Sequence, residues 1–138
     1  MPDNGIDFVG VDIGLGNLKK FHYLNTKKKH VINSSAAYLP VKDGVFGYVI
    51  SNSSIEHFYD LNLVIDQIGR VVKAGGNIIL SIPLRNPFIR KNWLEELTER
   101  GYIRNHGIHN YLTAREWINF LENKGFKIVK KIYYLHSR

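Results

Sequence analysis

The sequence contains no cysteine, which excludes disulfide bonds, thiolate nucleophiles and zinc sites built on cysteine. No apolar run approaches the roughly 20 residues that a membrane-spanning helix needs. The first residues show no basic segment followed by an apolar stretch, so we expect no secretory signal and a cytoplasmic location, in the cell or in a host cell. Repeats and Pro/Ser-rich linkers are also missing, and this absence predicts a single domain over residues 1–138.

The chain carries a formal net charge of +7, with lysines grouped at residues 19–20 and 27–29. A positive surplus of this size attracts polyanions through long-range electrostatic forces. A solvated face that aids solubility is the first interpretation, and a nucleic-acid or acidic protein partner is the alternative.

Short β-rich runs alternate with helical segments along the chain. This order is typical of βαβ units and predicts an α/β fold, with a Rossmann-like and mostly parallel sheet flanked by helices. The strands are expected at residues 6–13, 31–35, 46–50, 77–82 and 126–135, and the helices at 18–24, 60–72, 93–100 and after Thr113.

Two helix boundaries have specific signals. Thr113 and Glu116 form a capping-box sequence, in which each side chain satisfies a free backbone N–H at the start of a helix. Gly75 and Gly76 follow the helix expected at 60–72, and we predict that they end it with a left-handed cap.

A longer motif contains these glycines. Residues 70–83, RVVKAGGNIILSIP, resemble the Arg-Val-Leu-Lys-Pro-Gly-Gly segment and following apolar strand of the class I, Rossmann-like S-adenosylmethionine-dependent methyltransferases, especially their type 11 family. The resemblance runs from residue 8 to residue 129. It implies a reduced methyltransferase fold, S-adenosylmethionine as cofactor, and methyl transfer to an acceptor that the sequence does not identify.

Residues 35–40 and 46–49 are similar to the family segment that holds the adenine. The resemblance implies that Ser35 and Ala36 contact the cofactor there. The family has an aspartate at the position of Ser35, which can form hydrogen bonds but carries no charge. This departure weakens the inference of tight cofactor binding.

Asp12 ends the first predicted strand, and Ile13 and Gly14 follow it. The family places an acidic residue there that accepts hydrogen bonds from both ribose hydroxyls, so the resemblance implies that these three residues bind the cofactor. The strand matches the family's second strand, without the usual first strand and its glycine-rich loop. A first-strand assignment remains the alternative, because residues 12–17 also resemble that loop.

Residues 50–57 are similar to the segment that follows the family's fourth strand. Ligands of parallel α/β sheets bind outside the carboxyl ends of the strands, so Asn52 and Ser53 are expected to face cofactor and acceptor. Asn52 and His57 are the candidate catalytic residues, because an imidazole can exchange a proton near neutral pH. A packing or capping role for His57 remains open.

Residues 84–112 match the insertion with which the family covers its substrate. The candidate acceptor contacts there are Asn86, His106, His109 and Tyr111, and no metal site is expected. Because a missing central strand exposes neighbouring edges, we expect a homodimer that covers them. A catalytically silent methyltransferase-like subunit and a basic nucleic-acid-binding module are the alternative functions.

Overall fold

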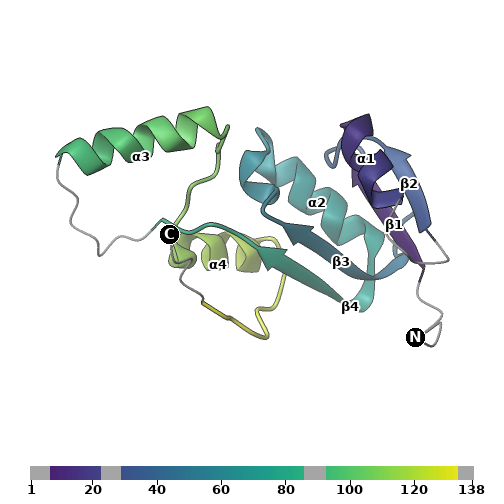
Figure 1. Cartoon of the computed structure of the whole chain (residues 1–138). Coiled ribbons are helices and arrows are strands. Elements are labelled where there is room, and N and C mark those ends of the chain that lie inside the picture. The colour runs from purple at the N-terminus through teal and green to yellow at the C-terminus, as the bar shows by residue number, and fades with distance from the viewer. Residues whose placement is uncertain (1–6, 23–28, 86–92, 134–138) are drawn as a thin grey trace. The chain divides into compact units, whose positions relative to one another are not determined.

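The computed structural model describes residues 7–22, 29–85 and 93–133 (Figure 1). In chain order its helices and strands are β1 (Phe8–Asp12), α1 (Leu15–His22), β2 (Lys29–Asn33), β3 (Phe46–Asn52), the 3-10 helix η1 (Ile55–His57), α2 (Leu61–Val71), β4 (Val72–Ser81), α3 (Trp93–Asn105) and α4 (Ala114–Asn123). Helices and strands are interspersed along the chain, with β2 followed directly by β3 and α3 directly by α4.

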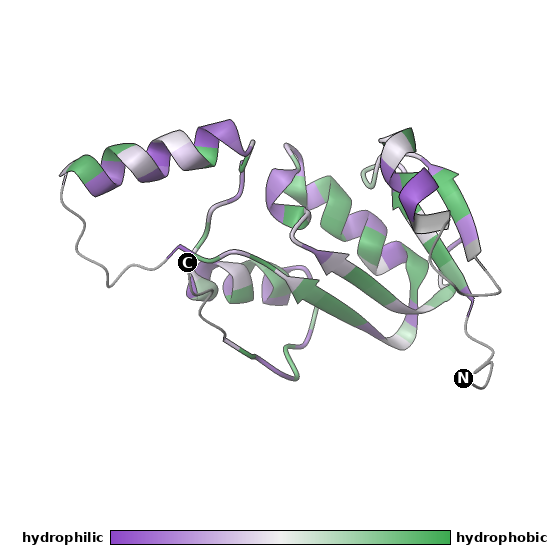
Figure 2. Cartoon of the chain, viewed as in Figure 1, coloured by the Kyte–Doolittle hydropathy of each residue, from purple (hydrophilic) through white to green (hydrophobic). Residues whose placement is uncertain are grey.

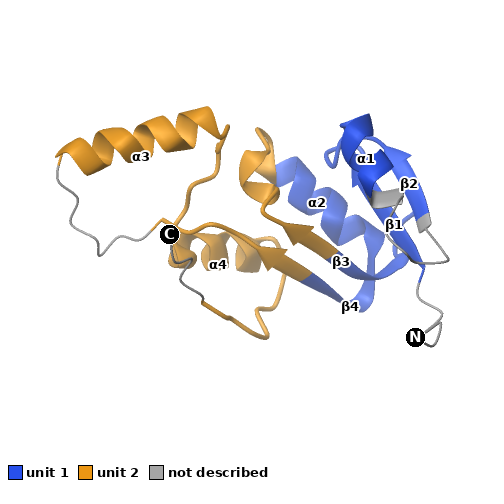
Figure 3. Cartoon of the chain, in the orientation of Figure 1, with its two compact units in different colours: residues 1–49, 62–78 blue, residues 50–61, 79–138 orange. Residues whose placement is uncertain are grey.

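The chain forms two compact units, coloured separately in Figure 3. Unit 1 comprises residues 1–49 and 62–78, and unit 2 comprises residues 50–61 and 79–138. Strands β3 and β4 both continue from one unit into the other.

In unit 1, β1 and β2 pair in parallel from Phe8 opposite Lys29 to Asp12 opposite Asn33. Helix α1 lies between them in sequence and contacts both strands. This βαβ arrangement confirms the α/β prediction. In a doubly wound sheet the second strand neighbours both the first and the third, so this direct pairing is compatible with either assignment of Asp12.

β3 and β4 form a second two-stranded sheet. The N–H of Val45 donates to the carbonyl of Val71 just before these strands, and the N–H of Ser53 donates to the carbonyl of Ser81 at their far ends, both at 2.9 Å. Residues therefore pair in the same sequence order along both strands, so β3 and β4 are parallel (Figure 1).

Helix α2 supplies much of the buried apolar surface of unit 1. Val64, Ile65, Ile68 and Val71 recur with helical spacing and are each less than 7% exposed. Figure 2 shows this hydrophobic character along α2 and along the strands. The predicted helix at 60–72 is thus confirmed within one residue at each end.

Two local predictions are wrong. Gly75 and Gly76 do not cap α2, which ends at Val71 and passes directly into β4. Instead, Gly44 and Val45 donate their N–H groups to the carbonyls of Arg70 and Val71, so a distant loop satisfies the end of the helix.

The second error concerns the strand expected at 126–135. Residues 126–133 form no strand, and residues 134–135 lie outside the described part of the chain. Val129, Ile132 and Tyr133 are exposed there, so the apolar pattern has no neighbouring strand to pair with.

Among the described residues, no helix combines the length and apolar character that crossing a bilayer requires.

Candidate functional site

The carboxylate of Asp12 stands at the carboxyl end of β1 and organises the turn that follows. Its Oδ1 accepts the backbone N–H of Gly14 at 2.6 Å, and its Oδ2 accepts the amide Nδ2 of Asn17 at 3.1 Å. A side chain at Gly14 would bring a Cβ atom to 3.1 Å from Oδ1, so the close approach depends on glycine. Asp12 therefore has a local capping role, and its remaining lone pairs can accept further donors.

Asn33 fixes the backbone on which Asp12 stands. From the end of β2, its Nδ2 donates to the carbonyls of Asp12 at 3.0 Å and Ile13 at 2.9 Å. Asn33 falls in the middle of the strand expected at 31–35, so no sequence signal marked it as a strand-end residue.

The turn that carries Ser35 and Ala36 begins beside Asp12. The N–H of Ser34 donates to the Asp12 carbonyl at 3.2 Å. The Ser35 hydroxyl accepts the N–H of Ala37 at 3.2 Å, and its carbonyl accepts the N–H of Tyr38 at 3.0 Å. Asp12 and Ser35, two of the candidate cofactor contacts, therefore lie at the same end of two paired strands in unit 1.

Ile13 adds an apolar surface at this end of the sheet. Its side chain is 78% exposed, although it lies directly after a strand. An exposed apolar side chain next to a carboxylate suits a ligand with one flat, weakly polar part and one part rich in hydroxyl groups.

Asn52 is the last residue of β3 and Ser53 follows it in unit 2, and both are exposed. Ser53 has a φ of 45°, a left-handed conformation that non-glycine residues rarely adopt. The hydrogen bond from its N–H to Ser81 holds it there. Strained backbone of this kind concentrates at functional sites.

His57 follows in η1, and its ring Nδ1 lies 3.0 Å from the carbonyl oxygen of Gly107. Its Nε2 lies 3.6 Å from Oε1 of Glu56, whose side chain is only 2% exposed. The sequence analysis named His57 but gave Glu56 no role, because burial of a glutamate in a short 3-10 helix has no sequence signal.

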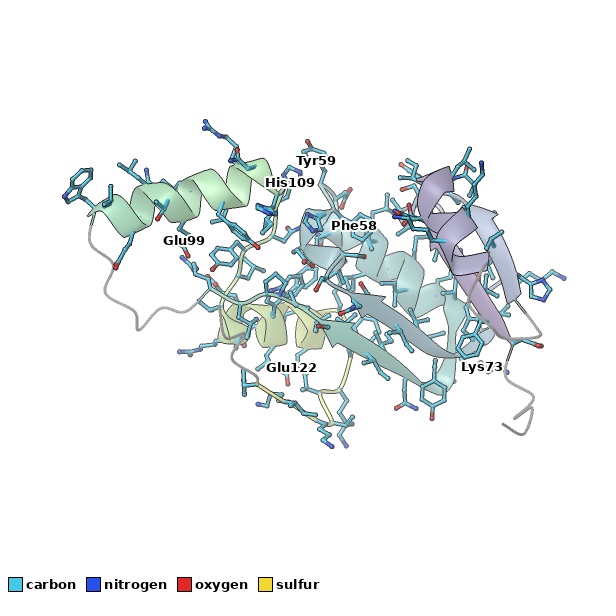
Figure 4. The ribbon with its side chains drawn as sticks, in the orientation of Figure 1. Phe58, Tyr59, Lys73, Glu99, His109 and Glu122 are labelled. Atoms are coloured by element: carbon cyan, nitrogen blue, oxygen red, sulfur yellow. The ribbon has the colours of Figure 1, made fainter. Side chains whose placement is uncertain are left out.

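The candidate acceptor contacts that the structure describes also lie in unit 2. His109 stacks on Tyr59 with ring centroids 3.9 Å apart (Figure 4), and His106 stacks on Tyr102 at 4.0 Å. The hydroxyl of Tyr111 donates to Glu99 at 3.1 Å. Asn86 lies outside the described residues.

Parallel strand pairing with an intervening helix defines a Rossmann-like α/β protein. The methyltransferase domain family matches residues 1–131, and the chain belongs to that family.

Known relatives and solved structures agree with this assignment. The uncharacterized protein MJ1123 of Methanocaldococcus jannaschii is 31% identical over 122 residues, which cover 88% of this chain and 57% of that protein. The demethylmenaquinone methyltransferase of Bacillus mycoides is 32% identical over 75 residues, or 54% of this chain and 31% of that enzyme. This chain therefore spans little more than half of the length of MJ1123.

Among solved structures, the BH2331 protein of Bacillus halodurans C-125 superimposes with a TM-score of 0.71 at 19% identity, covering 88% of this chain and 54% of the other. The [4+2]-cyclase SpnF gives a TM-score of 0.70, also at 19% identity, over 93% of this chain and 45% of its own. At these identities the likeness defines the fold alone.

Proposed function

We propose that this chain binds S-adenosylmethionine at the carboxyl ends of β1 and β2 and takes part in methyl transfer. The carrying observation is that Asp12 and the Ser34–Ser35 turn meet at the carboxyl ends of two paired strands, where the Asp12 carbonyl accepts the Ser34 N–H, within a chain of the methyltransferase domain family. Asp12 and Gly14 would receive the ribose, and Ile13, Ser35 and Ala36 would line the adenine.

The reaction needs little chemistry from the protein. The sulfonium of the cofactor is already a good leaving group, so the protein aligns donor with acceptor and excludes water. The remaining candidates come from the sequence resemblance: Asn52 and Ser53 as cofactor contacts, Asn52 and His57 as catalytic residues, and His106, His109 and Tyr111 as acceptor contacts. Asn86 stays a candidate from the sequence alone.

Calorimetric titration with S-adenosylmethionine and with its demethylated product tests the proposal. Asp12→Asn is the most informative variant. It keeps an oxygen that accepts the Gly14 N–H, but it loses the negative charge that favours two ribose donors. We expect saturable binding by the wild type and at least a tenfold loss in the variant. Asp43→Asn is the control, since that exposed carboxylate of unit 1 pairs with Arg70. Absence of binding by the wild type would overturn the proposal.

The acceptor is proposed to be a nucleic acid or an acidic protein, because the chain carries a net charge of +7. A related fold has been solved in complex with the Haloferax volcanii Trm112 methyltransferase activator, at a TM-score of 0.69. A fluorescence titration with short RNA and DNA at two salt concentrations tests whether the positive charge of the chain contributes to binding. Affinity independent of salt would contradict it.

We also propose a homodimer in the cytoplasm. Apolar side chains at alternate positions of β3, Tyr48 and Ile50, are each about two-thirds exposed, at 65% and 66%. Exposed apolar strand residues are commonly covered by a partner. Sedimentation equilibrium at micromolar concentration is expected to give twice the chain mass of 15.9 kDa, and a monomer would contradict the proposal.

A further inference from the structure

Unit 2 carries two pairs of stacked rings whose tyrosines are open to solvent. Tyr59 stacks on His109 with ring centroids 3.9 Å apart and ring planes inclined by 31° (Figure 4). Tyr102 stacks on His106 at 4.0 Å, also at 31°. Tyr59 is 89% exposed and Tyr102 is 47% exposed, and both histidines are exposed as well. Each pair therefore leaves ring surface available to a further flat partner.

Hydrogen bonds hold the rings of the first pair together. The N–H of His109 donates to the carbonyl of Glu56 at 2.9 Å. The side-chain amide of Asn110 donates at 2.6 Å to the carbonyl of Phe58, the residue directly before Tyr59. The two segments that carry the rings are thus joined next to the stack. A ring that is already ordered loses less conformational entropy on binding than a free one.

The second pair is fixed at the end of α3. The backbone N–H of His106 donates to the carbonyl of Tyr102 at 3.0 Å, and its ring Nδ1 lies 2.9 Å from the same oxygen. Ile108, between the two histidines in sequence, is 8% exposed, and its N–H donates to the carbonyl of Ile103 at 3.0 Å. This buried residue anchors the loop that carries His106 and His109, whose Cα atoms can lie at most about 11 Å apart.

The ring faces distinguish between the two acceptor classes of the proposed function. The face of an aromatic ring carries the negative part of its quadrupole, so it repels the carboxylates of an acidic protein. A nucleobase is flat and conjugated, and it stacks on tyrosine or histidine where proteins recognise unpaired bases. Bases within a duplex are already stacked on their neighbours. The exposed pairs therefore suit a single strand.

The charge of unit 2 suits the phosphates of such a strand. Its residues 50–61 and 79–138 contain 11 lysines and arginines against 7 aspartates and glutamates. Electrostatic attraction acts on the backbone of any nucleic acid, whatever the state of its bases. The ring pairs would add the preference for unpaired bases.

We propose that the Tyr59–His109 and Tyr102–His106 pairs bind unpaired bases of a single-stranded nucleic acid. That this strand is also the methyl acceptor rests on the proposed function, whereas the stacking itself does not. The two histidines are candidate acceptor contacts from the sequence. The two tyrosines are further contacts that the structure adds.

Fluorescence anisotropy at constant salt tests the proposal with end-labelled DNA strands of about ten nucleotides, a length that single-strand-binding folds cover. One strand carries all its bases. A matched strand of abasic sites has the same phosphates and no bases. We expect the wild type to bind the intact strand at least about fivefold more tightly, because stacking of one base contributes about that factor.

Variants separate the stacked pairs from other rings. Tyr59→Leu and Tyr102→Leu should each weaken binding of the intact strand by about fivefold or more and leave binding of the abasic strand unchanged. Tyr59→Phe keeps the ring and should bind as the wild type does. Tyr133→Leu is the matched control, because that tyrosine of unit 2 is 65% exposed and belongs to neither pair.

Three results would overturn the proposal: equal affinity for the intact and abasic strands, leucine variants that bind the intact strand like the wild type, or a control that loses as much affinity as they do. These measurements need no cofactor. Base-dependent binding by a chain that does not bind S-adenosylmethionine would reject the proposed function and leave the stacking standing. Cofactor binding without base-dependent binding would reject only the stacking.

Discussion

The guanidinium of Arg85 donates to both carboxylate oxygens of Glu116, at 3.1 and 3.0 Å. The same carboxylate accepts the backbone N–H of Thr113 at 2.7 Å and its hydroxyl at 2.8 Å. These contacts lower the pKa of Glu116 from 4.5 to about 2, with the backbone hydrogen bond from Thr113 as the largest cause, then its side chain, then Arg85.

This lowered pKa predicts an acid-sensitive contribution to stability. A carboxylate with a lower pKa in the folded state stabilises the fold above its ordinary pKa, and the gain is lost as pH falls from about 4.5 to about 2. Thermal unfolding between pH 2 and 6 should show a smaller pH dependence for Glu116→Gln than for the wild type. Glu122→Gln is the control on the same helix, and an equal slope in wild type and Glu116→Gln would contradict the prediction.

Thr113 itself should stabilise α4. Its hydroxyl accepts the N–H of Glu116 at 3.3 Å and completes the capping box. Thr113→Ala is expected to lower the free energy of unfolding by about 1 kcal/mol, as for other lost helix caps. Thr113→Ser retains the hydroxyl and should stay close to the wild type in urea denaturation. If serine costs as much as alanine, the methyl group matters and the cap does not.

Arg70 links α2 to the loop before β3. Its guanidinium donates to the carbonyls of Leu39 and Val41 and to the side chains of Asp43 and Gln67. Arg70→Met should lower the free energy of unfolding by about 2 kcal/mol, because two partly buried carbonyls lose a charged donor. Asp43→Asn should cost less than about 1 kcal/mol, since that carboxylate is exposed. If both variants lose the same free energy of unfolding in chemical denaturation, the ion pair with Asp43 contributes most of the stabilisation instead.

Alanine substitutions at the two adjacent glycines of β4 should destabilise the fold for different reasons. Gly75 has a φ of 73° with open space around it, so Gly75→Ala should cost about 1–2 kcal/mol in backbone strain alone. A Cβ at Gly76 would lie 2.9 Å from the Lys73 carbonyl and 3.0 Å from that of Gly47, so Gly76→Ala should cost about 1–3 kcal/mol through steric overlap.

Asparagine separates these two causes, because it tolerates left-handed backbone. Gly75→Asn should recover part of the stability that alanine loses, whereas Gly76→Asn should be at least as unstable as Gly76→Ala. Melting temperatures of the four variants provide the measurement. Recovery at position 76 would contradict the steric explanation.

Local signals in the sequence predicted several elements well. The Thr113–Glu116 pair fixed the start of α4 to the residue, because a capping box depends only on neighbours along the chain. The spacing of Val64, Ile65 and Ile68 predicted α2 for the same reason. Asp12 and the turn at Ser34–Ser35 lie at the same end of two paired strands, because parallel strands share their carboxyl ends.

Long-range contacts explain what the sequence could not reveal. The Gly44 and Val45 N–H groups replace the expected glycine cap of α2 from more than 20 residues away. Residues 126–133 have strand-like alternation, but a strand exists only where another offers hydrogen bonds. The backbone carbonyl of Glu56 accepts the N–H groups of His109 and Asn110, more than 50 residues away, so this contact appears only in three dimensions.

Every hydrogen bond described for the Asp12 carboxylate and carbonyl comes from residues 14–34. These contacts all come from unit 1. Under the proposed function, the orientation of Asp12 is therefore set within that unit. Substitutions at the acceptor candidates of unit 2 then change specificity without removing any of these hydrogen bonds.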